Sequence, residues 1–169
     1  MTVVVFETHA TSEDNESLIA TGWNGGALSR LGREQARELG ERRRDDVDAV
    51  VSSDLHRAVE TASIAFPDRP VQLDWRLREC DYGALTAMPK AQLDAERVAR
   101  IDVPWPGGES WRQAVARVAG ALDDLPGGRV LVIGHIATRW ALEHRCLGRS
   151  LEELAAEEFE WQPGWEYVL

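Results

Sequence analysis

The chain has 169 residues, of which 44% are hydrophobic and 28% are charged, so it fits one globular domain with its own core rather than a disordered chain. Its 19 Lys and Arg residues against 29 Asp and Glu residues give a formal net charge of −10. A field of that sign repels nucleic acid, and any phosphate site must therefore be built locally from a few placed cations.

The first half of the chain alternates short apolar strands with amphipathic helices. Thr2–Phe6 is a continuous β-branched and aromatic run, which predicts a strand buried on both faces. After a polar segment, apolar residues at helical spacing predict a helix over Leu31–Arg44 with Ser29 as its N-cap. Asp48–Ser52 is predicted to be a second strand, and Leu55–Phe66 a helix that ends before a proline.

The same alternation continues through the second half. Six further elements are predicted: strands at Val71–Leu73 and Arg129–Gly134, helices at Ser110–Leu125 and Ala137–Cys146, and late strands at Phe159–Trp161 and Tyr167–Leu169. Because strands alternate with helices, we expect a single α/β domain over residues 1–169, a three-layer α/β/α sandwich with a mostly parallel central sheet. The irregular segment 84–105 suits a cap inserted over a site.

Chemically active side chains follow the predicted strands at their carboxyl ends, where open α/β sheets bind ligands. His9 comes shortly after the first strand, Arg57 after the second, and His135 directly after the strand that ends at Gly134. Two of only four histidines in the chain therefore stand at such positions, which predicts a site at this edge of the sheet.

Several classes of site and compartment are not supported by the sequence. Cys80 and Cys146 alone cannot form a disulfide framework or a structural zinc site, and no Asp or His cluster has metal-ligand spacing. The first residues lack the basic region of a signal peptide, and no apolar stretch approaches the roughly 20 residues that span a bilayer. We therefore expect a cytoplasmic protein without metal or cofactor that binds neither nucleic acid nor membrane, in an oligomeric state that the sequence leaves open.

Other conspicuous residues have simpler interpretations. His56 and His144 are expected on the surface, and the two cysteines as small buried hydrophobic residues. The acidic run Glu152–Glu160 is expected to be a solvated helix face. The tryptophans of the second half are expected in the core rather than as a substrate platform: Trp105, Trp111, Trp140, Trp161 and Trp165.

The candidate residues fall within a series of ordered sequence blocks. The blocks are Thr8-His9-Ala10 with Asn15, Gly22-Trp23, Gly32-Arg33-Glu34-Gln35-Ala36, Ser52-Ser53-Asp54-Leu55-His56-Arg57-Ala58, Leu77-Arg78-Glu79-Cys80-Asp81-Tyr82-Gly83, Pro106-Gly107-Gly108-Glu109-Ser110 and Val130-Leu131-Val132-Ile133-Gly134-His135. In this order they resemble the histidine phosphatase superfamily, the phosphoglycerate mutase-like proteins, over nearly the whole chain.

The resemblance implies a phosphatase that hydrolyses a small phosphorylated metabolite, a phosphomonoester, through a phosphohistidine intermediate. It implies that His9 is the nucleophile and that Arg57 and His135 bind the phosphoryl oxygens. Glu79 would protonate the leaving oxygen and later deprotonate water, and Asn15 would add a neutral amide donor. No metal or cofactor is implied.

The first block departs from the family pattern. Thr8 stands where the family has an arginine, and Ala10 where it has a glycine. Loss of one preorganised donor costs about 10²–10³ in rate. Glu7 would also oppose a phosphate if it pointed inward, and the Ala10 methyl could crowd the approach of the backbone to phosphate. Four residues elsewhere could supply the missing charge: Arg76, Arg78, Arg139 and a protonated His56.

Three functions stay open at this point: a phosphomonoesterase, a repurposed enzyme on the same scaffold with a rebuilt pocket, and a catalytically silent pseudophosphatase that binds a phosphorylated ligand. Retention of His9, Arg57, Glu79 and His135 together favours an active phosphatase. The threonine at position 8 favours the repurposed enzyme and the pseudophosphatase. Because Thr8 and Ala10 both differ from the family pattern, while the other blocks match it, they point to a rebuilt pocket. The short chain argues against a full mutase.

Overall fold

The computed structural model describes all residues from 1 to 169, and its centre is a five-stranded sheet with the strand order β4-β3-β6-β1-β7. Four of the strands are parallel: β1 (Thr2–Thr8), β3 (Ala49–Ser52), β4 (Gln72–Leu73) and β6 (Gly128–Gly134). The fifth strand, β7 (Trp165–Val168), runs antiparallel to β1 at one edge. The sheet is therefore mostly parallel, as the sequence predicts.

The pairing of β1 with β6 sets the geometry of the molecule. The two strands are in register along their whole length, from Thr2 opposite Gly128 to Thr8 opposite Gly134. The ladder continues one residue further, because the His9 N–H donates to the Gly134 carbonyl at 3.1 Å. Parallel strands in this register end at the same edge of the sheet, so the residues that follow them lie side by side.

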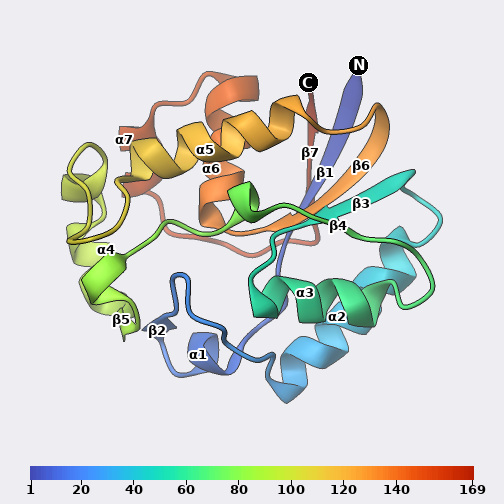
Figure 1. Cartoon of the computed structure of the whole chain (residues 1–169), viewed down its shortest axis with the longest axis horizontal. Helices are drawn as coiled ribbons and strands as arrows, with labels where there is room; N and C mark the ends of the chain where they lie inside the picture. The colour runs from blue at the N-terminus through green and yellow to red at the C-terminus, as the bar shows by residue number, and fades with distance from the viewer.

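Helices cover both faces of the sheet (Figure 1). One face carries α5 (Trp111–Asp123), α6 (Ile136–Leu147) and α7 (Leu151–Ala156), and the other carries α2 (Arg30–Arg43) and α3 (His56–Ala65). Side chains of β1 alternate between two cores: Val4 and Phe6 pack in the α5–α7 core, and Val5 packs in the α2–α3 core. The expected three-layer α/β/α sandwich is confirmed. None of the helices has the length and apolar character that a membrane span needs.

Short elements gather at one end of the sheet (Figure 1). They are α1 (Glu13–Glu16), β2 (Ile19–Ala20), β5 (Met88–Pro89) and α4 (Lys90–Glu96), with β2 and β5 forming a two-stranded antiparallel pair. Three 3₁₀ turns complete the chain: η1 (Trp75–Leu77), η2 (Gly83–Leu85) and η3 (Val98–Arg100). The segment 84–105 thus contains β5, α4 and η3 and belongs to no layer of the sandwich.

Local chemistry accounts for most element boundaries. The Ser29 side chain accepts from the Gly32 N–H at 3.1 Å, which caps α2 as predicted. Ser110 caps α5 with a capping box that includes Gln113. Helix α6 ends at Gly148, whose φ of 68° is the left-handed conformation that glycine adopts without strain.

The strand predicted at Phe159–Trp161 is wrong, because these residues form neither strand nor helix. The sheet edge beside β1 is already taken by β7, which begins at Trp165 rather than at Tyr167. The acidic run is helical only as far as Ala156. Trp161 is consequently 56% exposed, against the expectation that it is a core residue. The expectation holds for three of its companions, Trp105, Trp111 and Trp140, which are at most 4% exposed.

We expect Gly32→Ala to lower the free energy of unfolding by about 1–3 kcal/mol, the usual range for overpacking. A Cβ at Gly32 would lie 1.9 Å from the Thr11 carbonyl oxygen, so the α2 helix and the loop after β1 would have to separate. Gly120 of α5 is the matched control, because the atom nearest to a Cβ at this position would be 4.0 Å away. Gly120→Ala should stabilise by about 0.5–1 kcal/mol. Urea unfolding of the three proteins checks this, and equal midpoints would contradict it.

Candidate active site

A cavity of about 490 Å³ lies at the carboxyl ends of β1 and β6. Its walls include all six residues that the sequence predicts for the site: Thr8, His9, Asn15, Arg57, Glu79 and His135. The two imidazole rings follow neighbouring strands, and their centroids are 5.1 Å apart. The register of the sheet therefore brings together residues that lie far apart in the sequence.

The His9 ring has one defined neutral tautomer. Its Nδ1 lies 2.7 Å from the Ala10 carbonyl oxygen, which can only accept, so Nδ1 carries the hydrogen. The other ring nitrogen, Nε2, accepts from the Nε–H of Arg57 at 3.3 Å. The Nε2 lone pair of His9 thus faces the guanidinium group in the cavity.

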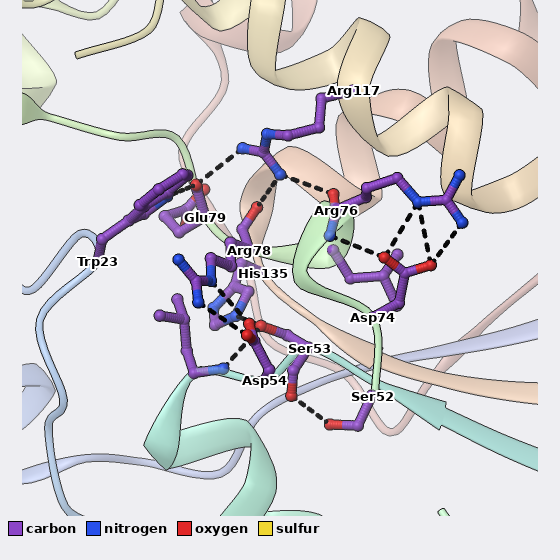
Figure 2. Close-up of polar contacts among 12 residues, drawn as sticks. Trp23, Ser52, Ser53, Asp54, Asp74, Arg76, Arg78, Glu79, Arg117 and His135 are labelled. Atoms are coloured by element: carbon purple, nitrogen blue, oxygen red, sulfur yellow. Dashed lines mark hydrogen bonds and ion pairs between the residues drawn. The ribbon is translucent and has the colours of Figure 1, made fainter. Parts of the chain in front are cut away.

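The His135 ring has the opposite tautomer for the same kind of reason. Its Nδ1 lies 3.4 Å from Nη2 of Arg57, which can only donate, so Nδ1 is unprotonated. Its Nε2 then carries the hydrogen and donates to the Ser53 hydroxyl at 2.9 Å. Ser53 follows β3 directly, so a third strand of the sheet contributes to the orientation of this ring (Figure 2).

Arg57, in the first turn of α3, is at the centre of these contacts and is only 3% exposed. Besides the two rings, its guanidinium group donates to the carbonyl oxygens of Gly22 at 2.9 Å and Asn24 at 3.2 Å. It therefore joins the loop before α2 to both histidines. All four acceptors are neutral, so the positive charge of Arg57 stays available to an anion.

The pKa values of both histidines are depressed. Burial, and then the charge of Arg57, lower the pKa of His9 to about 3. Burial lowers the pKa of His135 well below its ordinary value, and the charge of Arg57 adds to the effect. Both rings are consequently neutral at physiological pH, which agrees with the tautomers that the hydrogen bonds require.

The Glu79 carboxyl group lies at the N-terminus of α6. It accepts from the N–H groups of Cys80 at 2.9 Å, Ala137 at 3.2 Å and Ile136 at 3.3 Å. Burial raises the pKa of Glu79, while these N–H groups and the charge of Arg57 act against the rise. Burial is the largest of these influences, so the pKa of the carboxyl group is raised and its protonated form is favoured more than in water, as a proton donor requires.

Two possible obstacles to phosphate binding, Glu7 and Ala10, are absent from the cavity wall. The Glu7 carboxylate points towards α2, where Arg42 and Arg43 bind it at 3.2 and 3.0 Å. Alternation along β1 puts it on the face opposite to its neighbour at position 8. Ala10 does not line the cavity either, and its methyl group packs against Leu28.

Thr8 and Asn15 both line the cavity. Thr8 is the last residue of β1, and its short hydroxyl side chain brings no charge to the cavity. The Oδ1 atom of Asn15 accepts from the Ser12 N–H at 2.9 Å, which leaves its side-chain N–H groups to donate elsewhere.

The four residues that the sequence offers as possible substitutes for the missing charge do not line the cavity. Each is held elsewhere: Arg76 by Asp74 and Asp124, Arg78 by Asp54, Arg139 by Glu143, and His56 on the surface near Glu60. The additional cations of the cavity are Lys90 and Arg97, and both bind Asp94. No group of three His, Cys, Asp or Glu side chains is placed to hold a metal ion.

Several residues of the site are not among those that the sequence predicts. Tyr82 lines the cavity, and its place in the block that contains Glu79 could have indicated it. Ser53, which orients His135, directly follows a predicted strand, a position where the sequence indicates site residues. Phe159 and Trp161 also line the cavity, but an aromatic residue in a polar segment gives no signal that distinguishes a cavity wall from a core.

Comparison with known proteins gives one consistent result. A model of the histidine phosphatase superfamily (branch 1) matches residues 4–163. A 2,3-bisphosphoglycerate-dependent phosphoglycerate mutase of Methylobacterium sp. is 35% identical over 155 residues, which cover 79% of this chain and 74% of that protein. A phosphoglycerate mutase of Candida albicans is 39% identical over 100 residues, 54% of this chain but only 40% of that protein.

Among solved structures, a mycobacterial glucosyl-3-phosphoglycerate phosphatase in complex with VO3 superimposes with a TM-score of 0.77 at 30% identity. The superposition covers 91% of this chain and 86% of that one. The expected phosphoglycerate mutase-like fold is thereby confirmed.

We expect the His9 ring, whose pKa is about 3, and the His135 ring, whose pKa burial lowers well below its ordinary value, both to stay neutral below pH 6.5, where an unperturbed histidine gains a proton. Their ¹⁵N shifts should show Nδ1–H for His9 and Nε2–H for His135. The unfolded chain binds these protons at higher pH than the folded chain, so the free energy of unfolding should fall as pH drops from about 6.5 towards 3. A His9 imidazolium at pH 6 would contradict the geometry.

Proposed function

The chain belongs to the histidine phosphatase superfamily, and we propose that it hydrolyses a small phosphomonoester through a phosphohistidine formed at His9. The observation that carries the proposal is the neutral His9 ring, whose Nε2 lone pair faces Arg57 in the cavity. An imidazole in this state is a nucleophile that needs no further deprotonation. Its low pKa keeps it unprotonated across the physiological range.

In the first step, the Nε2 lone pair of His9 attacks phosphorus and the bond from phosphorus to the ester oxygen breaks. The Nε–H and Nη2–H groups of Arg57 turn from the ring nitrogens to the phosphoryl oxygens. Protonated Glu79 gives its proton to the departing oxygen, so the alcohol leaves and a carboxylate remains. Burial of Glu79 favours the protonated form that this step needs.

In the second step, water attacks the phosphorus of the phosphohistidine. The Glu79 carboxylate takes a proton from the water, the bond from phosphorus to Nε2 breaks, and its electron pair returns to the His9 ring. Inorganic phosphate leaves and both side chains regain their starting forms. The sum is one ester and one water converted to one alcohol and one phosphate.

His135 can donate to a phosphoryl oxygen after a change of tautomer. Its Nδ1 faces Arg57 and carries no hydrogen in the ligand-free protein. The Ser53 hydroxyl, which accepts from Nε2, can rotate to donate instead. The ring can then place its hydrogen on Nδ1, towards a phosphoryl oxygen, without becoming charged.

The leaving alcohol would contact the segment 84–105, which we propose acts as a cap. This segment contributes Leu93 together with the cations Lys90 and Arg97 to the cavity. The mycobacterial neighbour is named for a small phosphorylated metabolite, glucosyl-3-phosphoglycerate, and a substrate of that size class suits a cavity of about 490 Å³. A small phosphorylated metabolite is the substrate class we propose here.

One observation favours a second candidate, a pseudophosphatase that binds a phosphorylated ligand without turnover. Arg57 is the one guanidinium group that contacts either histidine, and Thr8 adds no charge beside it. A phosphoryl dianion would thus be neutralised less completely than in the family pattern. The two predictions that follow separate these candidates.

We expect the wild-type protein to turn over members of a phosphomonoester panel, and His9→Ala to lose at least about 10³-fold in kcat/KM, as when a nucleophile is removed. Turnover should persist in excess chelator, because the proposed steps use side chains alone. The exposed His144 on α6 gives the matched control, His144→Ala, which should remain active. A folded wild-type protein that binds phosphate but turns over no ester would support the silent candidate instead.

We expect Thr8→Arg to tighten the binding of inorganic phosphate and to raise kcat/KM by up to about 10²–10³-fold, the inverse of removing one preorganised donor. The reason is that Arg76, Arg78 and Arg139, which could have compensated for Thr8, pair with carboxylates outside the cavity. Thr8→Gln adds similar bulk without charge and should give no gain. If folded Thr8→Arg loses activity, alone and combined with Ala10→Gly, the pocket is rebuilt around threonine.

A further inference from the structure

Glu79 lies on a stretch of backbone that no helix or strand supports. It is placed between η1, which ends at Leu77, and η2, which begins at Gly83. The two histidines, in contrast, follow strands of the sheet directly. Backbone N–H groups, two of them from α6, hold the carboxyl group itself, but the main chain that carries Glu79 must be held by side chains.

Arg117, on α5, supplies most of these contacts (Figure 2). Its Nη1 donates to the carbonyl oxygens of Arg76 at 2.6 Å and Arg78 at 3.1 Å, and its Nη2 donates to that of Glu79 at 3.1 Å. Three carbonyls within four consecutive residues thus converge on one guanidinium group. Arg117 does not line the cavity, so it acts on Glu79 from behind.

Glu109 fixes the orientation of Arg117 through a bidentate ion pair. The Nε and Nη2 atoms of Arg117 each lie 2.7 Å from a Glu109 carboxylate oxygen. The same carboxylate accepts from the Asp81 N–H at 3.1 Å, and the Glu109 N–H donates to the Asp81 carbonyl at 2.9 Å. Glu109 therefore binds the backbone on the other side of Glu79.

These contacts use all five N–H groups of the Arg117 guanidinium: one on Nε, two on Nη1 and two on Nη2. A lysine ammonium at this position has only three donors and no planar fork, so it cannot reproduce the arrangement. The Arg117 side chain is 8% exposed, which keeps water from taking over these carbonyls.

Trp23 is a second donor to the Glu79 main chain. Its Nε1–H donates to the Glu79 carbonyl oxygen at 2.7 Å. Guanidinium carbons of Arg78 and Arg117 lie 4.7 and 5.7 Å from the centre of the Trp23 ring. The Glu79 carbonyl thus has two donors from distant parts of the chain, one on α5 and one on the loop before α2 (Figure 2).

We propose that Arg117, oriented by Glu109 and assisted by Trp23, is a positioning residue that aims the Glu79 carboxyl group at the leaving oxygen. The proposal rests on the proposed function, in which Glu79 transfers the proton. It gives the sequence block around Glu109 a role that the catalytic steps leave open. A carboxyl group displaced by about 1 Å loses of the order of 10²-fold in rate.

The test measures kcat/KM of Arg117→Lys over phosphate esters whose leaving groups differ in acidity, from ethyl through phenyl to 2,4-dinitrophenyl phosphate. An ethoxide needs the proton from Glu79 and a dinitrophenolate does not. For the ethyl ester we expect kcat/KM to fall about 10²-fold, which is within the range for losing a general acid. For the dinitrophenyl ester kcat/KM should fall less than about 3-fold. The dependence of log kcat/KM on leaving-group pKa becomes steeper.

Two comparisons isolate the effect. Arg112→Lys alters a half-exposed arginine of the same helix that binds Asp102, and it should leave the dependence unchanged. In a Glu79→Gln background, Arg117→Lys should cause no further steepening, because the group that it positions is absent. If Arg117→Lys fails to fold, Trp23→Phe removes a single donor to the Glu79 carbonyl. It should lower kcat/KM about 10-fold for the ethyl ester and leave kcat/KM for the dinitrophenyl ester nearly unchanged.

An equal loss for all esters, or none, would overturn the proposal while the phosphatase function stands. If the wild-type protein hydrolyses no ester, the proposed function fails and the Glu79 carboxyl ¹³C resonance decides the positioning separately. This resonance is assigned by its loss in Glu79→Gln, and it should shift in Arg117→Lys but not in Arg112→Lys. In Arg117→Lys the pKa of Glu79 should also fall towards its ordinary value, because water reaches the carboxyl group. An unchanged resonance would refute the positioning role.

Discussion

The buried charge of Arg57 is the constraint on which the site depends. Its guanidinium group donates to two carbonyl oxygens and to one nitrogen of each histidine, and all of these acceptors are neutral. Because arginine can only donate, both rings must present an unprotonated nitrogen to it. One cation thereby fixes the tautomers of His9 and His135 and, together with burial, lowers the pKa of both.

The reactive groups of the cavity are positioned in two different ways. His9 and His135 extend from paired parallel strands, so the ladder between β1 and β6 places them with little help from side chains. Glu79 has no such ladder, and its backbone is held by donors from Trp23 and Arg117. The N-terminus of α6 then holds its carboxyl group. Side-chain networks of this kind take over where regular structure ends.

Much of the fold and the set of candidate residues were predictable because the signals are local. Strand and helix periodicity indicates the sandwich, and the position of ligand sites at the carboxyl ends of parallel strands indicates His9, Arg57 and His135. The strand at Phe159–Trp161 failed because a short aromatic run does not show whether a sheet edge is free, and β7 occupies that edge. Trp161 is exposed at the cavity for the same reason.

The sequence by itself thus determined the layers of the fold, the strand ends and the residue types gathered there. The tertiary structure alone decided how those residues are charged and held. In the folded chain Arg78 pairs with Asp54, and Glu7 pairs with two arginines of α2. Arg117 donates to carbonyl oxygens about 40 positions away in the sequence. Partner choice and burial set these properties, and both arise only when distant segments pack together, so no local pattern of residues encodes them.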